Sequence, residues 1–192
     1  MSDREYRANL ILVRHGEAFT GPKGNGRLTG RGRKQARRLG QWLGENYRIQ
    51  SVYASPLIRT RETAQIINHS LGLTVILKEG LKGLGGEEKL REILPKSGGR
   101  FGIDASLQSS KRLDAAYQHL CRKVLMALSE ILQAQEKTVL LVTHTDIIAT
   151  LIRSLFGGHQ MAVNSDYTGV SLLHCENDQW EVDYLNRLEH LA

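Results

Sequence analysis

The stretch Leu10-Ile11-Leu12-Val13 runs directly into Arg14-His15-Gly16-Glu17. Four consecutive apolar residues indicate a buried strand, and the polar residues after them fall where that strand ends and the chain turns. In an α/β sheet, ligands bind at the edge where the strands end. The sequence therefore predicts a functional site at Arg14 and His15, on a chain of the α/β class.

Two further apolar stretches end in the same way. Residues 138–143 are typical of a buried strand and are followed at once by His144, which precedes an apolar helical run. Residues 51–54 form a third apolar stretch, which leads into a helix that carries Arg59. We expect these three strand ends to contribute to one site.

The helix after residues 51–54 has an unusual charge at its start. We expect Ser55 to be its N-cap and Pro56 its first residue. Arg59 then lies in the first turn, where the partial positive charge of a helix N-terminus disfavours a cation. Arg59, with Arg61 after it, fits a dianion bound between them. Together the three strand ends offer two arginines and two histidines, which predicts a phosphoryl group as the target.

These residues resemble a known family. Arg14-His15-Gly16-Glu17 is similar to the signature of the histidine phosphatase superfamily, which includes cofactor-dependent phosphoglycerate mutases and many phosphatases. Three more blocks occur in that family's order and at its approximate spacing: Leu28-Thr29 with Gly32 and Gln35-Ala36, Ser55-Pro56-Leu57 with Arg59 and Glu62-Thr63-Ala64, and Val142-Thr143-His144. Leu185-Asn186 with His190-Leu191 resembles the C-terminal pattern of its small phosphatases.

The resemblance implies a fold as well as an activity. We expect a three-layer α/β/α arrangement with a mostly parallel central sheet, helices on both faces and a single domain over residues 1–192. Residues 78–111 are rich in glycine and serine, and we expect them to form a lid or insertion over the substrate, with disorder as the alternative.

Composition narrows the class of partner. The chain has 192 residues and a net charge of +6, but aromatic residues make up only 6% and no nucleic-acid motif occurs, so the charge favours an anionic substrate. No apolar run approaches a membrane span, and residues 1–7 lack the features of a signal peptide. We expect a cytoplasmic protein, without membrane or nucleic-acid partners, in which Cys121 and Cys175 are reduced core thiols.

The resemblance implies a role for each site residue. His15 is expected to be the nucleophile, forming a phosphohistidine that water then hydrolyses. Arg14 and Arg59 are expected to clamp phosphate oxygens, while His144 stabilises the transferring charge and the backbone near Thr145 assists. No metal or cofactor is implied, because two arginines supply the positive charge. The substrate is then a phosphorylated small molecule or a protein phosphohistidine.

Two positions depart from the family pattern. The asparagine that usually lies six residues after the first histidine is Gly21 here, and Thr20 is the candidate to bind phosphate in its place. The glutamate that protonates the leaving oxygen falls on Gly83 in a gap-free count. Glu79 is our first candidate for this acid, with Glu87, Glu88 or no acid at all as alternatives.

The missing acid suggests a hypothesis about substrates. One branch of the superfamily, the protein phosphohistidine phosphatases, dispenses with the acid because its leaving group departs easily. A phosphatase without the acid prefers aryl phosphates, acyl phosphates or phosphohistidine over alkyl phosphates, which a comparison of kcat/KM tests.

Other functions remain open at this point. A phosphoglycerate mutase-type phosphotransferase and a catalytically silent phosphate-binding module are both compatible with the motifs. A metal site of His15, Glu17, His144 and Asp146 is a further alternative, although Arg14 would repel a cation there. The helix expected over residues 31–46 carries five basic residues in its first half, which form either a docking surface for an acidic partner or a solvated face: Arg31, Arg33, Lys34, Arg37 and Arg38.

Overall fold

The structure is a computed structural model that describes residues 7–20, 26–84, 87–94, 114–133, 137–177 and 179–192. Most of the expected lid at 78–111 lies outside these residues. The part that is described contains a short 3-10 turn, η1 (Glu79–Leu81), and a helix, α3 (Glu87–Ile93).

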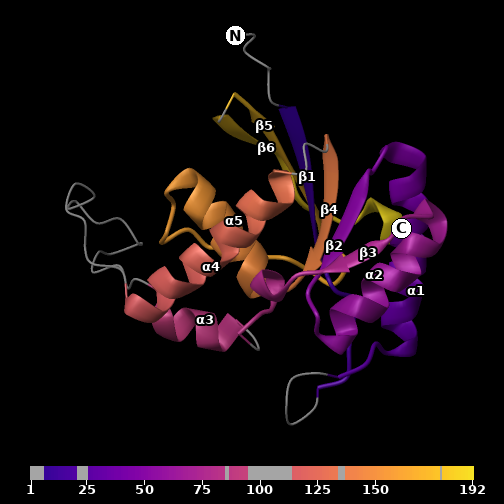
Figure 1. Cartoon of the computed structure of the whole chain (residues 1–192). Coiled ribbons are helices and arrows are strands. Elements are labelled where there is room, and N and C mark those ends of the chain that lie inside the picture. The colour runs from indigo at the N-terminus through magenta and orange to yellow at the C-terminus, as the bar shows by residue number, and fades with distance from the viewer. Residues whose placement is uncertain (1–6, 21–25, 85–86, 95–113, 134–136, 178) are drawn as a thin grey trace.

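A mixed sheet of six strands forms the centre of the molecule, in the order β3-β2-β4-β1-β5-β6 (Figure 1). The strands are β1 (Arg7–Arg14), β2 (Ser51–Ala54), β3 (Val75–Leu77), β4 (Thr138–Thr143), β5 (Val170–Glu176) and β6 (Gln179–Arg187). The first four strands in chain order run parallel to one another, while β5 pairs antiparallel with β1 and with β6. The sheet confirms the mostly parallel arrangement, and β5 and β6 form a C-terminal antiparallel hairpin.

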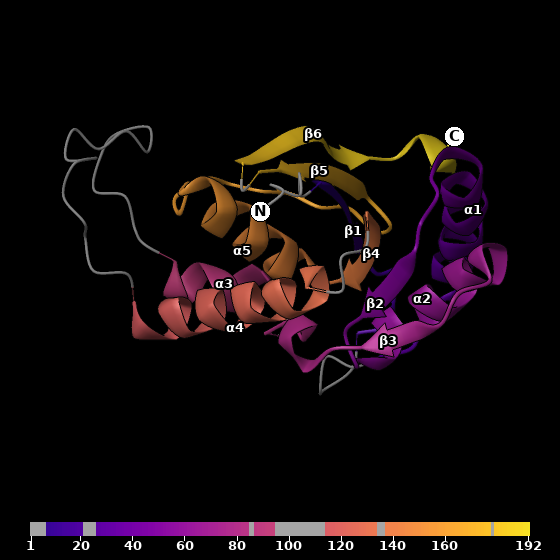
Figure 2. The same ribbon diagram turned by 45° about the horizontal axis from the view of Figure 1, so that its top comes forward.

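Helices cover both faces of this sheet (Figure 2). One face packs against α1 (Gly30–Asn46) and α2 (Ile58–Leu71), and the other against α4 (Ala115–Leu132) and α5 (Thr145–Phe156). Alternate residues of β1 divide between the layers: Leu10 and Leu12 belong to the core beneath α4 and α5, while Ile11 and Val13 belong to the core beneath α1 and α2. Burial on both faces explains the unbroken apolar run that the sequence shows.

Strand register brings the site residues to one edge. Arg14 pairs with Thr143 at the carboxyl ends of β1 and β4, and Ala54 of β2 pairs with Val142 beside them. The residues that follow these strands, His15, Ser55 and His144, therefore leave the sheet at neighbouring positions.

Helix ends agree with the sequence in most cases. Thr29 caps α1, its hydroxyl accepting the backbone N–H of Gly32 at 3.0 Å. Gly72 and Gly157 end α2 and α5 with φ of 69° and 67°, in the left-handed region that glycine adopts without strain. Cys121 and Cys175 are buried free thiols, as expected. None of the helices in the described part of the chain has the length and apolar character that a membrane crossing requires.

The predicted start of α2 is wrong. The N-cap position is Leu57, not Ser55, and α2 begins at Ile58. Pro56 therefore precedes the helix instead of opening it. The Ser55 hydroxyl accepts the backbone N–H of Leu57 at 3.3 Å and also contacts His144, so it belongs to the site described next.

Candidate active site

Three side chains from three strand ends form one buried cluster. Arg59 donates from Nε to Nε2 of His15 and from Nη2 to Nδ1 of His144, each over 3.1 Å. The two imidazole rings have centroids 5.2 Å apart and lie edge to face. The exposed fractions of His15, Arg59 and His144 are 7%, 8% and 3%. The cluster that the sequence predicted is thus assembled, with Arg59 between the two histidines.

Hydrogen bonds assign the tautomer of each histidine. Nδ1 of His15 lies 2.8 Å from the carbonyl oxygen of Gly16, which can only accept, so Nδ1 carries the hydrogen and Nε2 keeps its lone pair. Nδ1 of His144 accepts from Arg59, so its Nε2 carries the hydrogen and donates to Oγ of Ser55 over 2.8 Å. His15 therefore presents an unprotonated Nε2 to the site.

Burial keeps both histidines uncharged. It lowers the pKa of His15 to about 3, with the Gly16 hydrogen bond opposing the shift and the guanidinium groups of Arg59 and Arg14 adding to it. Burial likewise lowers the pKa of His144 to about 2, assisted by His15, Arg59 and Arg14. At neutral pH the imidazoles are neutral, which is the form a nucleophilic histidine needs.

Arg14 completes the positive side of the site. Its Nη1 donates to the carbonyl oxygen of Ser165 at 2.6 Å, and its guanidinium lies over the Tyr167 ring, 4.2 Å from the centroid. The Tyr167 ring is also 5.7 Å from that of His15. These contacts hold the guanidinium beside the two histidines without neutralising it.

Several buried polar atoms here lack a hydrogen-bond partner among the described residues. They include Nε of Arg14, Nη1 of Arg59 and Oγ1 of Thr145. Buried donors are ordinarily satisfied, so these three atoms indicate capacity for a ligand that accepts hydrogen bonds. A tetrahedral phosphate, with several acceptor oxygens, matches that need.

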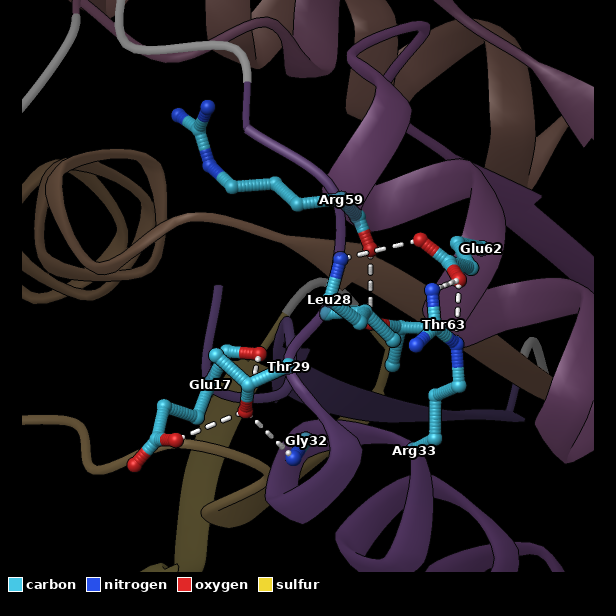
Figure 3. Close-up of polar contacts among 8 residues, drawn as sticks. All are labelled: Glu17, Leu28, Thr29, Gly32, Arg33, Arg59, Glu62 and Thr63. Atoms are coloured by element: carbon cyan, nitrogen blue, oxygen red, sulfur yellow. Dashed lines mark hydrogen bonds and ion pairs between the residues drawn. The ribbon is translucent and has the colours of Figure 1, made fainter. Parts of the chain in front are cut away.

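Residues around the site fix the loop after β1 (Figure 3). Oγ1 of Thr63 donates to the Arg59 carbonyl oxygen at 2.7 Å and accepts the Gly16 N–H at 3.0 Å. Glu62 accepts the Leu28 N–H at 2.9 Å and binds Arg33. In the figure, the Arg59 guanidinium extends away from this network. The network therefore fixes the backbone of α2 and leaves the guanidinium for the site.

Glycine is required where this loop meets α1. A Cβ atom at Gly16 would lie 2.7 Å from the carbonyl oxygen of Gly32. Glycine at position 16 thus lets the chain after His15 pass directly over the first turn of α1.

The metal-site alternative is not supported. Oε1 of Glu17 accepts from Oγ1 of Thr29 over 2.7 Å, and its second oxygen is 3.6 Å from Arg31 (Figure 3). Within the described ranges, no three His, Cys, Asp or Glu side chains are grouped so that they could hold a metal ion.

Other predicted site residues are exposed or fall outside the described residues. Thr20 and Arg61 are exposed, and Gly21 is outside the described residues. Glu79 is exposed in η1, where its charge favours the protonated form of Lys123 and so opposes the lowering of that lysine's pKa by burial. The side chains of Glu87 and Glu88 also fall outside the described part. Thr145 is buried and follows His144 directly.

Sequence reasoning missed the segment that lies across the end of β1. The backbone N–H of Thr168 donates to the Arg14 carbonyl oxygen at 3.1 Å, and Thr168 has a φ of 61°, a strained value for a β-branched residue. This segment supplies the Ser165 and Tyr167 contacts to Arg14. Neither residue belongs to a motif, so only their position just before a strand next to β1 could have suggested them.

A cavity on the surface of α1 lies apart from this cluster. Its volume is about 500 Å³, and all its lining residues belong to that helix except the last: Arg31, Lys34, Gln35, Arg37, Arg38, Gln41 and Leu191. We place the candidate active site at the histidine cluster because an unprotonated imidazole nitrogen and the unpaired donors are there, whereas the α1 cavity is lined by basic, amide and leucine side chains.

The chain is similar to known phosphatases and to a phosphoglycerate mutase-like protein. An uncharacterized phosphatase, PhoE, of Bacillus subtilis (strain 168) is 26% identical over 198 residues, covering 95% of this chain and 96% of that protein. Phosphoglycerate mutase-like protein 4 of Arabidopsis thaliana is 25% identical, covering 96% and 87%. The solved structure of a phosphoserine phosphatase mutant from Entamoeba histolytica, in complex with phosphoserine, shares the fold at a TM-score of 0.69 and 24% identity, covering 96% and 100%.

The model of one family matches almost the whole chain. It covers residues 10–188, which include Arg14 and the three residues of the cluster. With that match, this chain belongs to the histidine phosphatase superfamily, branch 1.

Proposed function

We propose that the protein is a phosphatase that hydrolyses phosphate monoesters or phosphohistidine through a covalent phosphohistidine on His15. One observation carries the proposal. His15 is neutral, is held at Nδ1 by the Gly16 carbonyl oxygen, and directs the lone pair of Nε2 toward the guanidinium of Arg59. A nucleophile directed at a cation is arranged to receive an anionic group that the cation binds.

The reaction proceeds in two displacements. An incoming phosphate draws the hydrogen bonds of Arg59 to its own oxygens, which frees Nε2 of His15 to attack phosphorus in line with the leaving oxygen. Arg14 binds the same oxygens through its unpaired Nε. Water then attacks the phosphohistidine, releasing phosphate and restoring the neutral imidazole.

Ser55 lets His144 assist this transfer. A hydroxyl both donates and accepts, so Ser55 can support His144 with its hydrogen on either ring nitrogen. With the hydrogen moved to Nδ1, His144 becomes a donor to a phosphoryl oxygen, while Ser55 donates to Nε2. His144 then stabilises negative charge as it develops in the transition state.

We further propose that the reaction needs no metal ion. Arg14 and Arg59 supply positive charge where metal-dependent phosphatases place cations, and arginine stays charged at any working pH. Activity that survives prolonged treatment with a chelator is the expected result.

The substrate class is proposed from the ligands of a structural neighbour and from the positive charge of the site. The neighbouring phosphoserine phosphatase from Entamoeba histolytica has been solved with phosphoserine and with 3-phosphoglyceric acid, both small phosphorylated acids. We propose a phosphorylated small molecule as the first class to screen, with a protein phosphohistidine as the second.

Trapping of the intermediate tests the proposal. Enzyme that is exposed to a labelled aryl or acyl phosphate and then rapidly denatured at alkaline pH should carry label in an acid-labile, base-stable bond at His15. His15→Ala should lose both label and turnover, whereas Glu45→Gln, an exposed change on α1, should keep both. Absence of label from the wild type would favour a silent binding module, and transfer of label to phosphoglycerate in preference to water would favour a mutase.

A further inference from the structure

A monoester phosphatase of this kind needs a proton donor, and this inference rests on the proposed function. When phosphorus moves from an alkyl oxygen to Nε2 of His15, the oxygen departs with the bonding electron pair and must gain a proton. The carboxyl group of Glu17 is bound to Thr29 and Arg31, and Glu79 is exposed in η1. Neither is placed to supply that proton.

Asp146 lies beside the catalytic cluster. It is in the first turn of α5, two residues after His144, and only 1% of it is exposed. Its Oδ1 accepts the backbone N–H of Ile147 at 3.0 Å, and its Oδ2 accepts the N–H of Leu84. Each carboxyl oxygen has a second lone pair, so one of them can carry a proton without loss of these bonds.

Gly83 shows where this carboxyl group is directed. A Cβ atom built at Gly83 would lie 2.7 Å from Oδ1 of Asp146 and 2.8 Å from Cγ of the His144 ring. The carboxyl group and the imidazole thus both border the space that a side chain at position 83 would occupy. Both groups therefore pack directly against the backbone at Gly83, which leaves no room for a side chain there and places the Asp146 carboxyl group beside the His144 ring.

The surroundings of Asp146 favour its protonated form. Burial raises the pKa of this carboxyl group, while the N–H groups of Leu84 and Ile147 and the charge of Arg59 oppose the rise. Lys123 of α4 is a second cation near this carboxyl group, and the charge of Asp146 opposes the lowering of the Lys123 pKa that burial causes. A bound phosphate dianion would add negative charge near Arg59 and favour the protonated carboxyl further.

We propose that Asp146 is the general acid of the reaction. In the first step the bond from Nε2 of His15 to phosphorus forms, the bond from phosphorus to the leaving oxygen breaks, and the Asp146 proton passes to that oxygen. In the second step water attacks phosphorus, the bond to Nε2 breaks, and the carboxylate takes the proton that the water loses. Asp146 ends protonated and His15 neutral, so the cycle closes.

This assignment changes the expectation that the chain lacks a general acid, which was drawn from the glycine at position 83. A chain without an acid would prefer leaving groups that need no proton. With Asp146 as the donor, the enzyme hydrolyses alkyl phosphates such as phosphoserine as well as aryl phosphates.

The test compares two leaving groups in Asp146→Asn. We expect kcat/KM for phosphoserine to fall by about 10²-fold to 10⁴-fold, because its oxygen needs the proton, and kcat/KM for 4-nitrophenyl phosphate to fall by less than about tenfold. Glu45→Gln, the same chemical change far from the site, should leave both values unchanged. Glu79→Gln tests the rival acid and should show no preferential loss on phosphoserine.

The outcomes separate this inference from the proposed function. Equal losses on both substrates would show that Asp146 only holds Leu84 and His144 in place, and a selective loss in Glu79→Gln would assign the acid to Glu79; either result overturns the inference while the phosphatase stands. Wild-type enzyme that neither hydrolyses substrate nor forms phosphohistidine overturns both. Should Asp146→Asn not fold, a series of phosphates assayed with wild-type enzyme decides: kcat/KM should depend weakly on leaving-group pKa, and a steep dependence overturns the inference.

Discussion

At the scale of single residues, Arg59 links the two histidines of the site. It donates to Nε2 of His15 and to Nδ1 of His144, so both imidazoles use a lone pair to bind one cation. Burial and the neighbouring cations lower both pKa values, and the rings stay neutral. Nε2 of His15 is thus kept unprotonated and bound to Arg59, and in the proposed mechanism an incoming anion frees it.

Ser55 gives a test of how His144 is positioned. Ser55→Ala removes the only recorded hydrogen-bond partner of Nε2 of His144 in the described chain and leaves a buried donor unsatisfied. We expect kcat for an aryl phosphate to fall by about tenfold, an effect of roughly 1.4 kcal/mol on the barrier, with KM little changed. Ser70→Ala, on the exposed end of α2, is the control. A raised KM with unchanged kcat would place Ser55 in substrate binding instead.

At the scale of elements, the sequence predicted most of the helices and strands, because the periodic spacing of apolar residues and the glycines that end helices are local signals. The strands that end at Arg14 and Thr143 were predicted correctly because both are buried on two faces. Ser55 was assigned to a helix cap because Ser-Pro is a local start signal, whereas a tertiary contact with His144 engages its hydroxyl. Tyr167 was missed because its contact with Arg14 depends on packing between segments far apart in the sequence.

The charge on α1 is unfavourable for that helix and gives a second test. Lys34 lies three or four residues from Arg31, Arg37 and Arg38, and no acidic residue occurs in the first turn. Lys34→Glu should stabilise the protein by about 0.5–1 kcal/mol, measured as the free energy of unfolding in urea, and the gain should shrink in 1 M salt. Arg48→Glu makes the same change in charge outside α1 and should give no such gain.

That result would bear on the docking surface predicted from the sequence. If Lys34→Glu gains stability and keeps full activity on an aryl phosphate, the basic face of α1 is maintained for neither folding nor catalysis. A loss of stability would mean instead that the repulsion is already relieved within the chain.

At the scale of the whole molecule, the fold places the imidazoles of His15 and His144 at the edge of a sheet covered on both faces, and their burial links the proposed activity to stability. Parallel register aligns the ends of β1, β2 and β4, and the helices on both sides exclude water from them. The burial that keeps the His15 imidazole neutral disfavours its protonation in the folded state, so acid should destabilise the fold.

The dependence of stability on pH tests this link. An unfolded histidine binds its proton near pH 6.5, whereas folded His15 and His144 do so only at about pH 3 and pH 2. Between those values the unfolded state holds more protons, so the free energy of unfolding should fall as pH falls below 6.5, by up to about 1.4 kcal/mol per pH unit for each histidine. His15→Gln should reduce this slope between pH 6.5 and pH 4.5, and His69→Gln, an exposed histidine of α2, should not. Equal slopes in wild type and His15→Gln would mean that His15 takes up its proton in the folded protein, contrary to a neutral nucleophile.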